Sequence, residues 1–315
     1  MEELSSRWIV QPGEVHIRLD QYLARHITGT SRSQVQAWIR AAEILVNGAR
    51  TKTGYLVRPG DEIILHRRAE PPPLPRPEQL PVTVIYQDGD LAVIDKPAGM
   101  VCHVGAGVRS GTLVNALLHH LGPIEGGDPV RPGIVHRLDK LSSGLMVVAK
   151  NNPSHQALSR QFQSRRVSKE YLALVYGRPT PPAGTIDLPL GRDPKNRKKM
   201  SVHARRSRNA VTHYAVEREY GPWTLLRIRI ETGRTHQIRV HLAHKGHPIV
   251  GDKLYGGNRS RTLRLAFLRE ALEHFQRVFL HAHRLEFYHP SSGALVSFTS
   301  PLPSELQDFL KSIQQ

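Results

Sequence analysis

Four ionisable side chains lie within five consecutive positions near the middle of the chain, and one of them is a carboxylate: His136, Arg137, Asp139 and Lys140. The Ser-Ser-Gly sequence at 142–144 is typical of a turn, and the unbroken apolar run 145–149 predicts a buried strand. Because a buried strand holds the loop at its end in place, such loops often carry catalytic groups. A carboxylate among cations can act as a charged nucleophile or as a proton acceptor. Asp139 is therefore a candidate for chemistry, although residue types alone favour a bland interpretation for a loop Asp, that of a solvated turn residue in a weak surface ion pair.

The overall charge of the chain points to a polyanionic partner. The 315 residues carry a formal net charge of +17 and a sequence pI near 10.4, and a charge so far from zero favours association with polyanions. No apolar stretch approaches the length that a membrane-spanning helix needs, and the first ten residues lack the basic start of a signal peptide. We therefore expect nucleic acid rather than a membrane as the partner. The single cysteine, Cys102, excludes an internal disulfide, which suits a reducing cytoplasm, and is expected to be a small buried side chain.

The positive charge is unevenly distributed along the chain. Residues 1–70 carry a net charge of +2, whereas residues 82–315 carry +15. The segment 191–208 alone holds eight lysines or arginines and one acid. Such a run is often only a solvated surface, but phosphate contacts of this kind would fix the position of a bound nucleic acid and make binding depend on salt. The candidate phosphate-binding residues in this segment are Lys195, Arg197, Lys198 and Lys199.

Two domains separated by a proline-rich stretch are predicted. Residues 1–70 read as a small α+β unit whose apolar positions recur first at helical and then at strand spacing. Its expected elements are helices around 19–23 and 35–39, with Ser31 or Ser33 as the cap of the second, and strands at 44–46 and 63–65. Six prolines in residues 71–81 favour an extended, semi-rigid spacer. The second domain then covers residues 82–315.

The second domain combines short strands with a few helices, which predicts an α+β fold. An apolar helix is expected over 112–121 with Thr112 as its cap, and an amphipathic helix over 154–163. A short helix should end at Gly246, and an amphipathic helix is expected near residue 310. Strands are predicted at 84–86, 91–94, 171–175, 226–230, 281–287 and 295–299.

Four histidines between residues 231 and 256 suggest a metal site at first sight: His236, His241, His244 and His247. Zinc sites usually add Cys, Asp or Glu ligands at defined spacing, so we expect no metal here. The chain also lacks a phosphate-binding loop and a dinucleotide-binding fingerprint. The sequence therefore predicts no cofactor.

Three sequence motifs of the second domain together resemble those of the RluA/RluD-type pseudouridine synthases. The string HRLDKLSSGL around Asp139 is similar to the signature loop HRLDKxTSGL of that family, and TGRTHQIRVHL at 232–242 matches its third motif almost letter for letter. DKPAG at 95–99 resembles the first motif, a strand that abuts the active site. The resemblance covers nearly the whole chain. It implies a catalytic domain built on a mixed, mainly antiparallel β-sheet flanked by helices.

The resemblance also implies roles for individual residues. Asp139 would be the catalytic carboxylate, Arg239 its ion-pair partner, and Arg137 the residue that enters the RNA helix as the target base flips out. Tyr171, in the K-x-Y pattern of the family, would stack on the flipped uracil and is a candidate acceptor of the proton on carbon 5. Two positions depart from the family pattern: Leu141 replaces a usual Asp, and Ser142 replaces a usual Thr.

The first domain resembles the ribosomal S-four-type RNA-binding domain. The similarity lies in RLDQYL, SRSQVQAWIRAAEILVNG and VRPGDEI, in that order between residues 18 and 63. It implies that Arg32, Arg40 and Lys52 face RNA. The alternative is a generic small α+β domain.

Together these resemblances imply an enzyme that isomerises specific uridines to pseudouridine. The architecture is most similar to the family member that modifies a stem-loop of large-subunit (23S) rRNA, so rRNA or a precursor of the large ribosomal subunit is the expected partner. We expect a cytoplasmic monomer without a membrane contact. The alternatives are a tRNA-directed enzyme of the same family, a non-catalytic RNA-binding factor in ribosome assembly, and a hydrolase using Ser142 or Ser143.

Overall fold

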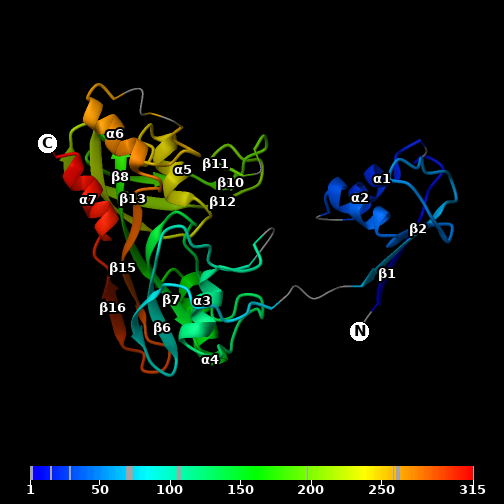
Figure 1. The fold of residues 1–315 in the computed structure, drawn as a ribbon, viewed down its shortest axis with the longest axis horizontal. Coiled ribbons are helices and arrows are strands. Elements are labelled where there is room, and N and C mark those ends of the chain that lie inside the picture. Colours follow the sequence, from blue (N-terminus) through cyan, green and yellow to red (C-terminus); the bar gives the residue numbers. More distant parts are fainter. Residues whose placement is uncertain are drawn as a thin grey trace. The chain divides into compact units, whose positions relative to one another are not determined.

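The structure, a computed structural model, divides into two compact units, Met1–Pro73 and Leu74–Gln315 (Figure 1). The residues that it describes are 3–14, 16–27, 30–68, 74–104, 108–196, 198–257, 259 and 263–314. Each unit has a hydrophobic core of its own, and the two are described separately below.

The first unit is a four-stranded antiparallel sheet with two helices. The strands pair in the order β1 (Glu3–Ile9), β4 (Glu62–Arg68), β2 (Ile44–Val46) and β3 (Ala49–Arg50). The helices are α1 (Leu19–His26) and α2 (Arg32–Arg40), and Ser31 caps the second by accepting a hydrogen bond from Gln34 N at 3.3 Å. Both predicted helices and both predicted strands are confirmed. Strand β1 was not predicted, because its sequence alternates only weakly between apolar and polar residues.

A buried carboxylate lies inside this first unit. Asp20 accepts hydrogen bonds from Arg32 Nε at 2.8 Å, Gln36 Nε2 at 2.5 Å and Arg18 Nε at 3.2 Å. Burial disfavours its charge, but the hydrogen bonds from Arg18, Gln36 and Arg32 outweigh that effect and hold the pKa of Asp20 well below its usual range. Its ion pairs join the start of α1 to the start of α2.

The second unit is built on a nine-stranded sheet (Figure 1). Eight of its strands pair in the order β5 (Thr83–Gln87), β6 (Leu91–Lys96), β7 (Ser143–Ala149), β15 (Leu280–Tyr288), β8 (Ser168–Tyr176), β14 (Trp223–Ile230), β13 (Val211–Tyr220) and β9 (Ala183–Asp187), and β16 (Leu295–Thr299) pairs with β15. Only the β7–β15 pair is parallel. The expected mixed, mainly antiparallel sheet is confirmed.

Strand β15 joins the two halves of this sheet. One of its edges pairs with β8 along most of its length, and the other pairs first with β7 and then with β16. The parallel contact with β7 is very close at Gly144, where φ is +114° and an added Cβ would lie 2.3 Å from Ala282 O. Only glycine fits such a position, which gives the Ser-Ser-Gly turn a structural reason.

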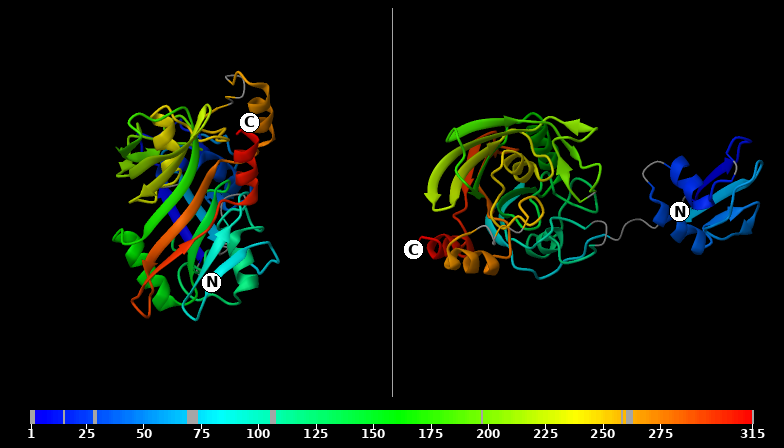
Figure 2. Two further views of the ribbon diagram at one scale, coloured as in Figure 1. Left: turned by 90° about the vertical axis from the view of Figure 1, so that its left-hand side faces the viewer. Right: turned by 90° about the horizontal axis from the view of Figure 1, so that it is seen from above.

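In the described part of the second unit, five helices and a small three-stranded sheet accompany the large sheet. The helices are α3 (Leu113–His120), α4 (Asn152–Gln163), α5 (Gln237–His244), α6 (Ala266–His274) and α7 (Ser304–Ser312). The helix expected over 112–121 is confirmed as α3, with Thr112 and Asn115 forming a reciprocal cap. Helices α6 and α7 pack together at one end of the sheet (Figure 2). The basic segment 191–208 supplies the small sheet, in the order β11 (Met200–Ser201), β10 (Leu190–Arg192) and β12 (Ser207–Arg208).

Much of the proline-rich stretch belongs to the second unit. Glu78 N donates to Asn115 O at 2.9 Å, Asn115 Nδ2 donates to Arg76 O at 2.8 Å, and Leu80 packs on the main core. Residues 74–81, predicted as spacer, are therefore tied to α3. Residues 71–73 lie outside the described residues.

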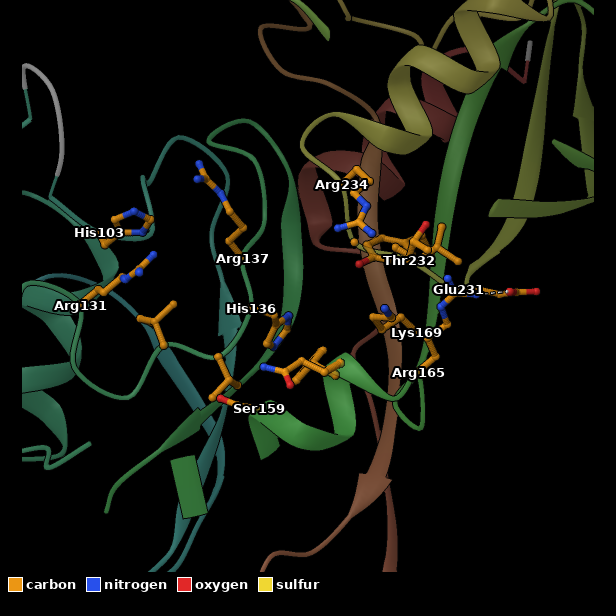
Figure 3. Close-up of a pocket in the computed structure, with 17 residues that line it drawn as sticks. His103, Arg131, His136, Arg137, Ser159, Arg165, Lys169, Glu231, Thr232 and Arg234 are labelled. Atoms are coloured by element: carbon orange, nitrogen blue, oxygen red, sulfur yellow. Dashed lines mark ion pairs between the residues drawn. The ribbon is translucent and has the colours of Figure 1, made fainter. Parts of the chain in front are cut away.

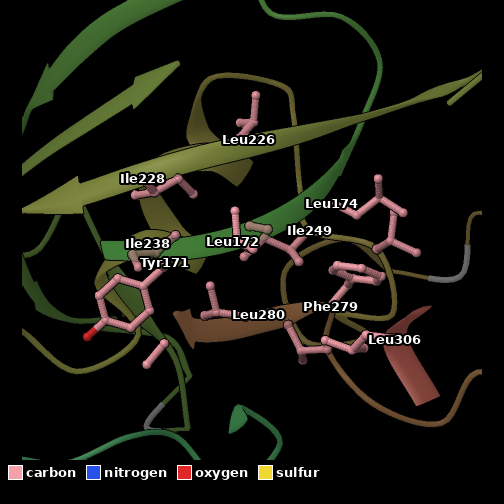
Figure 4. Close-up of a cluster of buried hydrophobic side chains, with 14 of the residues drawn as sticks. Tyr171, Leu172, Leu174, Leu226, Ile228, Ile238, Ile249, Phe279, Leu280 and Leu306 are labelled. Atoms are coloured by element: carbon pink, nitrogen blue, oxygen red, sulfur yellow. The ribbon is translucent and has the colours of Figure 1, made fainter. Parts of the chain in front are cut away.

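The main core of the second unit lies between strands β8, β14 and β15 and the helices that cover them. Leu172, Leu226 and Phe279 are among its buried side chains, and Tyr171 lies at its edge with the hydroxyl projecting away from the cluster (Figure 4). Among the described residues, no helix is both long and apolar enough to cross a membrane.

Candidate active site

The loop that carries Asp139 is anchored on both sides of that residue. Cys102 Sγ donates to Leu138 O at 3.2 Å, and Ser142 N donates to Asp139 O at 3.1 Å. The next carbonyl, Lys140 O, accepts from Gly99 N at 2.7 Å. The loop leads directly into β7, as predicted, and Cys102 is buried, as expected. Because its neighbours are fixed, the Asp139 side chain has a defined position.

A buried lysine supports the same loop. Lys96 is completely buried, and its ammonium donates to Pro97 O at 2.7 Å and Met100 O at 2.9 Å, with Lys140 O at 3.5 Å. Burial lowers the pKa of Lys96 to about 8. This gives the DKPAG segment a positioning role that sequence reasoning did not identify.

The structure brings Arg239 of α5 to Asp139, a hundred residues earlier in the chain. Arg239 Nη1 donates to Asp139 Oδ2 at 2.9 Å. Asp139 Oδ1 makes no hydrogen bond to any described residue, so it is the oxygen available to a substrate. A neighbouring cation favours the charged form of a carboxylate. The pair therefore keeps a reactive oxygen at the surface of the site.

Arg239 has a second carboxylate partner that sequence reasoning missed. Its Nε and Nη2 donate to the two oxygens of buried Asp252 at 2.7 and 2.9 Å. Burial opposes the charge of Arg239, but Asp252 and Asp139 outweigh it and raise its pKa above the usual value. This bidentate contact fixes the plane of the guanidinium, so Asp252 orients the group that holds Asp139. The acid lies in GDKLYG, next to the third motif, and its proximity was the one available signal.

A histidine and a tyrosine form a further layer around the ion pair. His236 Nδ1 lies 2.7 Å from the Tyr255 hydroxyl, and His236 Nε2 lies 3.9 Å from Asp139 Oδ2. Burial lowers the pKa of His236 and raises that of Tyr255 to about 12, so both are neutral near pH 7. The Tyr255 hydroxyl also accepts from Met200 N at 2.8 Å, so Tyr255 and His236 form a hydrogen-bonded pair beside Asp139. The backbone at His236 is left-handed, with φ +56°.

Tyr171 of β8 contributes a ring to the wall beside Asp139. The side chain is buried, and its hydroxyl has no hydrogen-bond partner among the described residues. Burial, together with the charge of Asp139, raises the pKa of Tyr171 above its usual range. The phenol therefore stays protonated at neutral pH.

Two adjoining cavities meet at these residues. The smaller, about 70 Å³, is lined by Asp139, Tyr171 and Arg239. The larger, about 560 Å³, shares Arg137, Tyr171 and Arg234 with it. Arg137 is exposed and forms no hydrogen bond or ion pair with the described residues, so its side chain is free to move toward a bound RNA (Figure 3).

The other predicted RNA contacts lie apart from the catalytic residues in the chain. Arg32 is half exposed, but its Nε pairs with Asp20. Arg40 and Lys52 are exposed. Lys195 and Lys198 are exposed beside the small sheet, and the Lys199 ammonium lies 5.9 Å from the centre of the Tyr255 ring. Arg197 lies outside the described residues.

The serine hydrolase alternative finds no support in the geometry. Ser143 Oγ lies 2.9 Å from His281 Nδ1, but both residues are buried and Arg277 Nη2 donates to the same oxygen at 2.6 Å. Ser142 is also buried, and its hydroxyl has no partner among the described residues. Leu141, the other departure from the family pattern, is exposed and leaves the Asp139 contacts unaffected.

The four histidines between residues 231 and 256 have separate partners. His236 bonds to Tyr255, His241 Nδ1 lies 2.9 Å from Thr212 Oγ1, and His247 Nδ1 lies 2.9 Å from Tyr176 O. The His244 ring packs edge-on against His203. Each imidazole is thus explained by packing or hydrogen bonding.

Comparison with known proteins shows to which family the chain belongs. Residues 90–244 match the RNA pseudouridylate synthase family, and residues 17–63 match the S4 domain. The chain is 41% identical over 305 residues to ribosomal large subunit pseudouridine synthase D of Escherichia coli K12, covering 96% of this chain and 92% of that protein. An uncharacterised RNA pseudouridine synthase of Chlorobaculum parvum is 44% identical over 310 residues, covering 95% and 94%. The solved structure of human RNA pseudouridylate synthase domain containing 1 is 25% identical with a TM-score of 0.58, covering 74% of this chain and 89% of that one. The chain therefore belongs to the RNA pseudouridine synthase family and contains an S4 domain.

Proposed function

We propose that the protein converts uridines of large-subunit rRNA to pseudouridine, with Asp139 as the catalytic carboxylate. The observation that carries this proposal is the contact of Asp139 Oδ2 with Arg239 at 2.9 Å, which leaves Oδ1 free beside the Tyr171 ring. The rRNA target is inferred from the 41% identity to a large-subunit enzyme over nearly the whole chain. That the protein is a monomer and that it lies in the cytoplasm remain predictions.

The reaction breaks the bond between the uracil nitrogen and the ribose, turns the base, and joins carbon 5 to the sugar. The base must first leave its helix, because the reacting atoms are unreachable in a stack. Arg137, exposed and unpaired among the described residues, would then fill the vacated position, and the Tyr171 ring would hold the base by stacking.

The proton on carbon 5 must leave after the new bond forms. The Tyr171 hydroxyl is neutral, because burial and the Asp139 charge raise its pKa. It can therefore accept that proton only while passing its own proton on. The charge of Asp139 acts on this phenol, and the released proton must finally reach nitrogen 1 of the turned base, so that the reaction remains an isomerisation.

Mapping pseudouridines in total RNA from cells with and without the gene tests this function. We expect one or a few rRNA uridines to lose the modification without the gene and to regain it with the wild-type chain but not with Asp139→Asn. Loss confined to tRNA would replace the rRNA assignment with the tRNA-directed alternative. If no modification is lost, the chain acts as a non-catalytic RNA-binding factor.

A further inference from the structure

The larger cavity beside the catalytic pocket has more positive charge than the reaction described above uses. Its volume is about 560 Å³, which is in the range of small-ligand sites. Arg131 and Arg137 lie on one wall, and Arg165, Lys169 and Arg234 lie on the facing wall (Figure 3). The acid that lines it is Glu231, whose carboxylate pairs with His213 at 2.9 Å and Arg165 at 3.6 Å. Arg131 pairs with Asp128 at 3.3 Å, whereas Arg137, Lys169 and Arg234 have no ion pair with a described residue.

Lys169 is the clearest sign that this cavity has a ligand. It is only 7% exposed, yet its ammonium forms no hydrogen bond or ion pair with any residue that the structure describes. The ammonium lies 5.8 Å from the centre of the Phe162 ring. Burial lowers its pKa to about 8, with no carboxylate to offset the effect. Most of the side chain is buried, whereas the ammonium reaches the cavity without an acid beside it, so an anionic group of a ligand would pair with it.

The position of Lys169 relates this anion to the target uridine. Lys169 and Tyr171 are two residues apart in β8, so their side chains leave the same face of the strand. Two residues of a strand span about 7 Å. An anion on Lys169 therefore lies about one step of an RNA chain away from a base held against Tyr171.

The cavity also offers an aromatic surface beside Lys169. His136 stacks on Phe162 with ring centres 4.5 Å apart. Val147 N donates to His136 Nε2 at 3.0 Å, and burial lowers the pKa of His136 to about 3. The ring is thus neutral, and its Nδ1 proton has no partner among the described residues. Splayed RNA bases bind by stacking on such rings and by hydrogen bonds to their edges.

We propose that this cavity receives a second nucleotide of the RNA, directly next to the target uridine, with its phosphate on Lys169 and its base against the His136–Phe162 pair. The proposal rests on the proposed function, because it takes the target uridine to lie against Tyr171. The protein would then bind two consecutive nucleotides, and the nucleotide next to the target uridine would contribute to the choice of target.

The test measures binding and turnover with a synthetic RNA stem-loop that contains the mapped uridine, or an oligouridylate if mapping finds none. In separate RNAs, each phosphate flanking the target is replaced by a neutral methylphosphonate, and each flanking base is removed. The proteins are the wild type, Lys169→Gln, Lys169→Arg and Phe162→Leu. Lys311→Gln is the matched control, because Lys311 is an exposed lysine of α7 that lines neither cavity.

One methylphosphonate should weaken wild-type binding roughly 10- to 100-fold, the effect of losing a charged hydrogen bond. Lys169→Gln should lose about the same factor on unmodified RNA and be insensitive to that methylphosphonate. Its salt dependence should fall by about one phosphate contact. Lys169→Arg should keep most of the affinity, and Lys311→Gln should match the wild type. Removal of one flanking base should weaken the wild type and not Phe162→Leu.

The proposal is overturned if Lys169→Gln binds unmodified RNA within about twofold of the wild type, or if it keeps the full methylphosphonate penalty. If removal of neither flanking base weakens wild-type binding, the nucleotide assignment is overturned and only a phosphate contact is left. Turnover separates this proposal from the proposed function. Binding with the expected phosphate dependence but no pseudouridine would refute the function, whereas pseudouridine formation without that dependence would refute the second site.

Discussion

Replacing Lys169 by methionine should stabilise the second unit while weakening RNA binding. Burial lowers the pKa of Lys169 from 10.5 to about 8, and each pKa unit corresponds to 1.36 kcal/mol, so the charged ammonium costs the fold about 3 kcal/mol. Methionine keeps the length of the side chain, but it loses the cation–π contact with Phe162, a contribution of about 0.5–1 kcal/mol. The expected net gain in the free energy of unfolding is about 2–3 kcal/mol at pH 7.

The gain should depend on pH in a defined direction. Below pH 8 the lysine is protonated in both the folded and the unfolded chain, so its full cost is present. Between pH 8 and 10.5 the folded chain has lost the proton and the unfolded chain keeps it, so wild-type stability rises with pH. The difference between Lys169→Met and the wild type should therefore shrink above pH 8 and be small at pH 10.5.

Urea unfolding at pH 7, 9 and 10.5 measures this difference. Replacing Trp8 and Trp38 of the first unit by phenylalanine leaves Trp223 as the only tryptophan, so fluorescence reports the second unit alone. Lys311→Met, at an exposed position, should change stability by less than about 0.5 kcal/mol. A destabilised Lys169→Met, or a gain that is the same at every pH, would refute the assignment of an unpaired buried charge.

Four further outcomes are expected. Asp139→Asn should abolish pseudouridine formation and keep RNA affinity within a few-fold; measurable turnover of the purified variant would contradict its catalytic role. Tyr171→Phe should cleave the glycosidic bond but stall before tritium release from carbon 5, and Tyr171→Ala should lose roughly 1–3 kcal/mol of stacking; normal tritium release from the Phe variant would limit Tyr171 to stacking. Arg239→Met should cost about 3–5 kcal/mol in urea unfolding, because two carboxylates lose their shared cation; an unchanged midpoint would exclude this. Deletion of residues 1–73 should weaken RNA binding but leave a folded and slowly active enzyme; inactivity at saturating RNA would show that the first unit helps to form the site.

Local sequence signals predicted the parts of this fold that depend on local physics. The capped helix α3, the Asp139 loop and the strand after it follow from turn residues and apolar runs. Motif resemblance additionally connected Asp139 with Arg239. The 2.9 Å contact between them shows the expected neighbours together.

The remaining features depend on contacts between distant segments. Asp252 reaches Arg239 only because the chain turns back after α5, and the Lys96 ammonium meets its third carbonyl, Lys140 O, only after the Asp139 loop has docked. Residues 74–81 read as a spacer because proline content says nothing about a surface to pack on, and α3 provides that surface. The partnerless state of Lys169 is likewise invisible in the sequence, where it reads as an ordinary strand lysine.

The central place of β15 has a consequence for the order in which the protein is made. Asp139 lies just before β7 and Tyr171 lies in β8, and the strand that joins β7 to β8 comes more than a hundred residues after both. A ribosome synthesising this chain therefore releases both halves of the sheet before the strand that unites them exists. Pairings between such distant segments form slowly. We expect a nascent chain stopped before residue 280 to hold the catalytic residues on two separate pieces of sheet, and so to remain inactive until the strand at Leu280–Tyr288 is in place.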